Sequence, residues 1–261
     1  MSDREREHAT RVLEQFTKQA EPFARFAIHT QASSLELLRD ALRLSGRERL
    51  LDAGCGPGLL LRYFAPMVSE VVGLDATPAM LHKAREVLRE AGITNVSTQH
   101  GDMEQLPFAD ASFDAVVTRY TFHHLLRPER AFEELVRVCK PGGRVVVCDA
   151  TPRPDARAAY DAWELVRDPS HASARTEQEL ASLADAHLVS THLMRFRLES
   201  VVEDLLASCF PTDRAALYRR MADDVGVNAL DMAAQLRGDT LMMAFPISVI
   251  AGNKPAVSAR M

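Results

Sequence analysis

The sequence has few cysteines, few lysines and no long apolar run. Its cysteines are scattered at positions 55, 139, 148 and 209, with no C-x-x-C pair and no His/Cys cluster at structural-zinc spacing. This distribution argues against a disulfide-stabilised secreted scaffold and a zinc-bound class of protein. It favours reduced thiols in a cytoplasmic protein with no bound metal.

Two further absences bear on membranes and nucleic acids. The segment Ser2–Glu7 is too charged for a secretory signal, and no window reaches the apolar length of a membrane span. Only 4 of the 31 basic residues are lysine, the basic residues do not cluster, and the formal net charge is -5. Because phosphate backbones attract clustered basic side chains, we expect neither a membrane nor a nucleic acid as partner.

The first 151 residues alternate between strand and helix patterns. With 261 residues, 47% of them hydrophobic, the chain can form one sizeable α/β domain with an insertion. The spacing predicts strands at 49–53, 70–75, 96–100, 113–118 and 144–149, with helices at 31–44, 59–67, 77–91 and from 128 onwards. Right-handed crossovers then give a doubly wound parallel sheet.

The pattern changes after Thr151. We expect a helical stretch over 156–166, a capping box at 176–179, a sixth strand over 188–198, a helical stretch over 199–236 and a last strand over 241–251. The predicted organisation is N-terminal helices forming a lid (1–46), a ligand-binding core (47–151), and the rest of the sheet with helical substrate-side insertions (152–261).

A glycine loop follows the first predicted strand. Gly54, Gly56 and Gly58 open a helix, so backbone N–H groups can approach a ligand without obstruction by side chains. Asp75 ends the next strand, about 20 residues later, where a carboxylate can accept from both ribose hydroxyls. We therefore predict a nucleoside site, although a tight turn with a helix-capping acid is the simpler alternative. The G-x-G-x-G spacing disfavours a dinucleotide.

These segments carry a family resemblance. Leu50–Gly58 resembles the first motif of class I S-adenosylmethionine-dependent methyltransferases, in the small-molecule branch around the ubiquinone/menaquinone C-methyltransferases (methyltransferase type 11). Gly73–Asp75, Gly101–Phe108 and Lys140–Gly143 follow in that family's order. The resemblance implies a Rossmann-like, seven-stranded, mostly parallel sheet with an antiparallel last strand. It also implies S-adenosylmethionine as cofactor and a small-molecule methyl acceptor.

The resemblance assigns roles to individual residues. It implies that the methionine moiety lies beside Asp52, Gly54, Gly56 and Arg119, the ribose at Asp75, and the adenosine along Ala76, Met80, Gly101, Asp102 and Met103. Asp102 would accept a hydrogen bond from the adenine amino group.

Three histidines are the candidates for catalysis. Methyl transfer is an in-line displacement in which positioning supplies most of the rate, and a general base is needed only for a protonated nucleophile. His123 and His124 follow the fourth strand, and His171 lies in the insertion. The alternatives are that His124 packs structurally and that His171 lies on a solvated loop.

Other conspicuous side chains have simpler interpretations. Phe16, Phe23 and Phe26, with Gln19, can form a lid over the cofactor, but their near-helical spacing favours core packing. Cys55 lies in the glycine loop without a predicted cation beside it, so it is expected to be a small apolar filler.

Competing functions lack their signatures. No Tyr-x-x-x-Lys pair follows the fourth strand, which disfavours an oxidoreductase, and no Asp/Asn-Pro-Pro-aromatic motif marks a nucleic-acid methyltransferase. The remaining alternative is an S-adenosylmethionine-binding protein of another function, either a pericyclic catalyst or a regulatory module. We expect an aromatic, quinone-like or secondary-metabolite acceptor. The methylated atom and the formation of a homodimer stay open.

Overall fold

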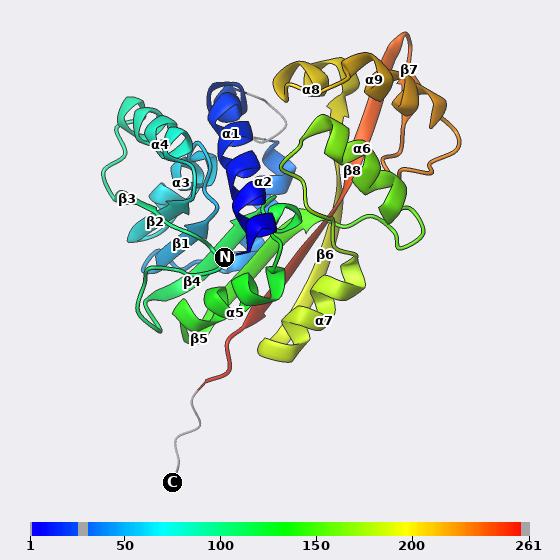
Figure 1. Ribbon diagram of the computed structural model, residues 1–261. Coiled ribbons are helices and arrows are strands. Elements are labelled where there is room, and N and C mark those ends of the chain that lie inside the picture. Colours follow the sequence, from blue (N-terminus) through cyan, green and yellow to red (C-terminus); the bar gives the residue numbers. More distant parts are fainter. Residues whose placement is uncertain (1, 26–30, 257–261) are drawn as a thin grey trace.

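The computed structural model describes residues 2–25 and 31–256, and a twisted sheet with helices on both faces organises them (Figure 1). The strand order is β3-β2-β1-β4-β5-β8-β6. The strands are β1 (Arg49–Ala53), β2 (Glu70–Asp75), β3 (Val96–His100), β4 (Phe113–Arg119), β5 (Cys139–Ala150), β6 (Val189–Val201) and β8 (Thr240–Asn253), and a short β7 (Gln235–Arg237) pairs with β8.

The strand directions agree with the predicted fold. Strands β1 to β5 pair in parallel, whereas β8 runs antiparallel to both β5 and β6. The seven-stranded, mostly parallel sheet with an antiparallel last strand is therefore confirmed, with β7 as a small addition. The carboxyl ends of β1, β2, β4 and β5 lie at one edge, where ligands bind in such sheets.

Helices cover both faces of the sheet. They are α1 (Asp3–Arg25), α2 (Ala32–Leu42), α3 (Leu59–Phe64), α4 (Pro78–Glu90), α5 (Pro128–Val138), α6 (Arg157–Arg167), α7 (Glu177–His187), α8 (Val202–Ser208) and α9 (Arg214–Asp223), with 3₁₀ turns η2 (Ala65–Met67) and η3 (Phe122–His124). The predicted capping box at Thr176 and Glu179 is present at the start of α7. Within the described ranges, no helix is long and apolar enough to cross a membrane.

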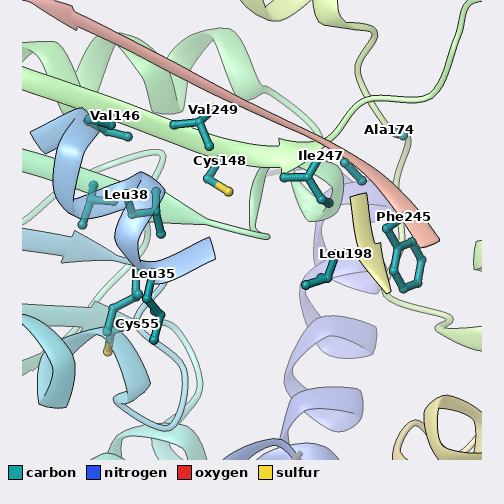
Figure 2. Packing of buried hydrophobic residues seen from close by; sticks show 14 of the residues in the cluster. Leu35, Leu38, Cys55, Val146, Cys148, Ala174, Leu198, Phe245, Ile247 and Val249 are labelled. Atoms are coloured by element: carbon teal, nitrogen blue, oxygen red, sulfur yellow. The ribbon is translucent and has the colours of Figure 1, made fainter. Parts of the chain in front are cut away.

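Two hydrophobic clusters hold the layers together. Because successive strand residues point to opposite faces, Leu50 packs in a cluster with α2, α3 and α4, whereas Leu51 packs with α5 and α7. Figure 2 shows the first cluster, in which Leu38 of α2 packs near Val146 and Val249 of the sheet.

The predicted helical stretch over 199–236 is wrong in its second half. Its first residues end β6, and α8 and α9 follow, but beyond Asp223 the chain forms turns and then β7. The Asp224 carboxylate accepts from the amides of Ala229 and Leu230, and the Asn228 side chain accepts from the amide of Ala233. These side-chain bonds to the backbone compete with helix formation.

Candidate active site

A cavity of about 490 Å³ lies at the carboxyl ends of β1, β2 and β4, with α1 as part of its wall. The strand ends converge there because the strands are parallel. All ten residues predicted to hold the cofactor line this one cavity: Asp52, Gly54, Gly56, Asp75, Ala76, Met80, Gly101, Asp102, Met103 and Arg119.

The glycine loop connects directly to the acid of β2. The amides of Gly54 and Cys55 donate to the Leu74 carbonyl at 2.7 and 2.9 Å, which anchors the loop beside β2. Asp75 accepts from the amide of Gly56 through Oδ2 and from that of Thr77 through Oδ1, both at 2.8 Å. Each carboxylate oxygen keeps a further lone pair for a hydroxyl donor. Burial raises the pKa of Asp75, although these amides act against the rise.

Asp52 is a buried acid at the floor of the cavity. Only 2% of the residue is exposed, and within the described ranges neither carboxylate oxygen has a hydrogen-bond partner. Burial raises its pKa to about 7, Asp75 adds to the rise, and the charge of Arg119 opposes it. An acid that is costly to ionise becomes stable as an anion when a cation enters the cavity.

Part of the cavity lining is suited to a flat apolar ring. Met80 and Met103 are buried and line it, while the exposed Asp102 keeps its Oδ1 on the amide of Glu104 at 2.8 Å. Thioether side chains adapt to ring faces, and the second carboxylate oxygen of Asp102 can accept from an amino group.

The three predicted catalytic histidines form one cluster. The ring centroids of His123 and His124 are 4.1 Å apart, and those of His123 and His171 are 5.6 Å apart. His123 Nδ1 donates to Oδ1 of Asp149 at 2.6 Å, and His171 Nε2 donates to Oδ1 of Asp161 at 2.7 Å. The solvated-loop alternative for His171 is wrong, because its side chain is fully buried.

The environments of these histidines differ. Burial acts to lower the pKa of His123, but the charge and hydrogen bond of Asp149 outweigh it and raise this pKa. Burial and the neighbouring His123 lower the pKa of His124, whose Nδ1 lies 3.1 Å from the Ser170 carbonyl. His123 is therefore the stronger base of the two.

A second cavity, of about 80 Å³, adjoins the first. Phe16, Phe23, Tyr120 and His124 line both, so these four side chains stand at the junction. Its remaining walls include His123, Ala150, Tyr160, Leu198, Leu205, Phe245 and Ile247, together with the buried Glu164 and Arg167.

Comparisons with known proteins identify the family. Residues 51–147 match the family model described as a methyltransferase domain. The uncharacterised methyltransferase YcgJ of Bacillus subtilis is 33% identical over 174 residues, which cover 66% of this chain and 69% of YcgJ. The chain belongs to this methyltransferase family. The cofactor that this membership implies is S-adenosylmethionine.

Other relatives of this methyltransferase agree with the assignment. Demethylmenaquinone methyltransferase of Clavibacter sepedonicus is 38% identical over 125 residues, which cover 47% of this chain and half of that protein. The crystal structure of YcgJ matches with a TM-score of 0.79 at 26% identity, covering 87% of this chain and 100% of that one. The [4+2]-cyclase SpnF matches with a TM-score of 0.64 at 21% identity, covering 86% and 82%, which shows a shared fold alone.

The residues of the methyltransferase cavity fit S-adenosylmethionine. The carboxylate of Asp52, which has no hydrogen-bond partner among the described residues, fits the α-ammonium group, and the Asp75 oxygens have capacity for ribose hydroxyls. At Gly56 an added Cβ would meet nothing within 4 Å, so the loop leaves open space for the ligand. Cys55, by contrast, is buried in the hydrophobic cluster, and burial raises its thiol pKa well above the ordinary value, as expected for an apolar filler.

Several residues at the site were missed from sequence. Asp149 is the penultimate residue of β5, at the ligand edge of the sheet, and that position was the available signal for it. Phe16 and Phe23 line the cavities, so the interpretation as core packing is wrong for them, whereas Gln19 of the same set is buried. Phe26, the third phenylalanine of the set, lies outside the described residues.

Proposed function

We propose that this methyltransferase transfers the methyl group of S-adenosylmethionine to a small organic molecule with an aromatic or quinone-like body. The larger cavity holds the cofactor, and the ten residues predicted from sequence have the roles that the family resemblance implies. The smaller cavity receives the reacting end of the acceptor. The N-terminal segment 1–46 covers the site, 47–151 forms the cofactor-binding core, and 152–261 completes the sheet and shapes the acceptor side.

The observation that carries this proposal is the apolar, aromatic junction between the cavities. Phe16, Phe23 and Tyr120 stand there, and the rest of the smaller cavity is mainly hydrocarbon and aromatic. Most of this cavity's surface offers a charged aliphatic acceptor no hydrogen bonds in exchange for its lost hydration, and the lining Glu164 and Arg167 already pair with each other. A flat, weakly polar acceptor loses little and gains contact area.

The protein's contribution to the reaction is positioning. When bound, the cofactor supplies a methyl group made electrophilic by the positive sulfonium. Asp52 and Arg119 can hold the two charged ends of the methionine moiety, and Asp75 can fix the ribose. Helix α1 covers the site and is held there by two contacts. Nε2 of His8 lies 2.7 Å from the His124 carbonyl oxygen, and Oε2 of Glu21 pairs with Nζ of Lys83 at 2.6 Å. Closure excludes water and aligns the acceptor for in-line attack.

The first experiment is a calorimetric titration of the purified protein with S-adenosylmethionine, S-adenosylhomocysteine and NAD. Binding of the two sulfur nucleosides alone is expected. A screen with tritium-labelled methyl donor then compares phenols and hydroxyquinones with aliphatic amines and acids of equal size. Methylation of charged aliphatic compounds alone would refute the proposed acceptor class.

A pericyclic or regulatory role has less support. SpnF carries out cyclisation on a similar fold, but this likeness extends to the fold only. Family membership instead favours methyl transfer. We also propose a cytoplasmic location, because the four cysteines are free and buried. Whether the protein forms a homodimer stays open, and sedimentation can test it.

A further inference from the structure

We infer that His123, oriented by Asp149, is a general base facing the acceptor cavity, and that the acceptor is a phenol or enol methylated on its hydroxyl oxygen. The inference rests on the proposed function and deepens it. In it, His123 is the catalytic residue and Asp149 is a positioning residue that acts through it.

Asp149 is rigidly placed to orient an imidazole. It is 2% exposed, and its Oδ2 accepts from the amide of Phe122 at 2.6 Å while Oδ1 accepts from that of Ala150 at 2.7 Å. The remaining partner of Oδ1 is Nδ1 of His123 at 2.6 Å. A carboxylate on Nδ1 fixes the tautomer in which Nε2 carries the lone pair.

The other ring nitrogen of His123 is available. The side chain is 12% exposed and lines the smaller cavity. Among the described residues, His123 Nε2 has no hydrogen-bond partner, although the ring is otherwise enclosed. A group that enters the cavity can therefore meet a lone pair on a base whose orientation is already set.

The surroundings favour His123 over its neighbours in the cluster. The charged groups acting on it are Asp149 and Glu164, which raise its pKa, and Arg167, which opposes them; His124 and His171 pack against its ring. Burial lowers the pKa of His124, which makes it a weak base. His171 lines neither of the two cavities and already binds Asp161.

The chemistry that needs such a base is transfer to a protonated oxygen. The hydroxyl proton moves to Nε2 of His123 as the oxygen forms a bond to the methyl carbon. The bond between sulfur and that carbon breaks, and its electron pair stays on sulfur. The positive charge thus passes from the sulfonium to the imidazolium, where the Asp149 carboxylate stabilises it. The remaining proton is released to solvent after the product leaves.

A titration without cofactor or acceptor tests the base directly. Nitrogen-15 histidine NMR of the wild-type protein should show His123 titrating above its ordinary pKa with Nδ1 protonated in the neutral form. In Asp149→Asn the His123 pKa should fall, because the carboxylate charge is lost. A wild-type His123 that titrates below its ordinary pKa, or carries its neutral-form proton on Nε2, would overturn the inference.

Kinetics test the same assignment with an acceptor found in the screen. His123→Asn should lower kcat/KM by about 100-fold or more, while S-adenosylhomocysteine affinity stays within about twofold. The loss should shrink for acceptors with more acidic hydroxyls, since these ionise without help. His192→Gln, on the exposed face of β6, is the matched control and should keep wild-type kinetics.

The outcomes separate this inference from the proposed function. If no aromatic hydroxyl compound is methylated although the cofactor binds, the proposed acceptor class fails. If such a compound is methylated on carbon, or if His123→Asn loses the same factor with every acceptor acidity, the general-base assignment fails while the proposed function stands.

Discussion

The backbone amide of Gly56 donates a hydrogen bond to Oδ2 of Asp75 at 2.8 Å. Together with the bonds from the Gly54 and Cys55 amides to the Leu74 carbonyl, this bond joins the loop after β1 to the end of β2. The other oxygen of Asp75 holds the amide of Thr77 at the start of α4. Asp75 therefore shapes the loop, and in the proposed function it also receives the ribose.

Replacing Asp75 should weaken cofactor binding. Asp75→Ala removes charge-assisted bonds to two hydroxyls, so S-adenosylhomocysteine affinity should fall by about 2–3 kcal/mol, measured by calorimetry. Asp223→Ala, at the exposed end of α9, is the control and should bind normally. For a ligand analogue that lacks both ribose hydroxyls, Asp75→Ala should lower the affinity much less. If the substitution lowers the affinity equally for both ligands, Asp75 acts only through the loop.

Gly54 should tolerate no side chain. Its φ is +79°, and an added Cβ would lie 2.5 Å from Oγ1 of Thr121. Gly54→Ala should therefore lower the free energy of unfolding by the backbone strain of about 1–2 kcal/mol plus a similar overpacking cost, measured by urea denaturation. Gly142 has a φ of +77° with open space around it, so Gly142→Ala should show the strain alone.

The double variant Gly54→Ala, Thr121→Ala checks the cause of this loss. Removing Oγ1 and Cγ2 of Thr121 should recover part of the overpacking cost. If Gly54→Ala and Gly142→Ala cost the same, crowding at Thr121 makes no contribution.

The first half of the fold could be predicted because its signals are local. The strands over 49–53 and 70–75 have the bounds expected from sequence, since apolar runs and glycine breaks mark buried parallel strands. The region after Asp223 could not be predicted in this way. There the carboxylate of Asp224 and the side chain of Asn228 satisfy backbone amides in a pattern that helical spacing does not reveal.

The site was predictable where it depends on strand ends. The ten residues predicted to hold the cofactor line one cavity because parallel strands bring their carboxyl ends together. The pairing of His123 with Asp149 depends instead on the register of β4 and β5, in which Arg119 lies opposite Cys148. The docking of α1 is harder still, since an amphipathic pattern does not say that His8 will meet the His124 carbonyl.

A buried ion pair that lines the smaller cavity should be costly to break. Glu164 and Arg167 are 1% and 8% exposed, and Nε of Arg167 donates to Oε1 of Glu164 at 2.9 Å. Arg167→Met leaves a buried carboxylate unpaired, so the free energy of unfolding should fall by about 3–5 kcal/mol in urea titrations at pH 7. Arg220→Met, on the exposed face of α9, should cost under about 0.5 kcal/mol.

The companion double variant separates pairing from packing. Glu164→Gln combined with Arg167→Met should be more stable than Arg167→Met alone, because no charge is left without a partner. If the double variant is less stable than the single one, Glu164 stabilises the fold through contacts other than its pairing with Arg167.

Asp52 should lower the free energy of unfolding of the ligand-free protein as pH rises towards neutral. With its pKa raised to about 7 by burial, the ligand-free folded state binds its proton more tightly than the unfolded state does. Stability from this group is therefore lost as pH rises from about 4 to about 7. Between pH 5 and pH 8 the unfolding free energy of Asp52→Asn should gain about 2–3 kcal/mol relative to wild type, measured in urea.

Cofactor affinity, in contrast to stability, should increase as pH rises. In the proposed role the ionised Asp52 binds the α-ammonium group, so wild-type affinity for S-adenosylhomocysteine should rise with pH, by up to about tenfold per pH unit below pH 7, and then level. Asp52→Asn should bind more weakly and lose this slope in calorimetric titrations. Asp110→Asn, an exposed acid away from the cavity, should keep the wild-type slope. If Asp52→Asn retains the slope, the proton linked to binding belongs to another group and the ammonium is held elsewhere.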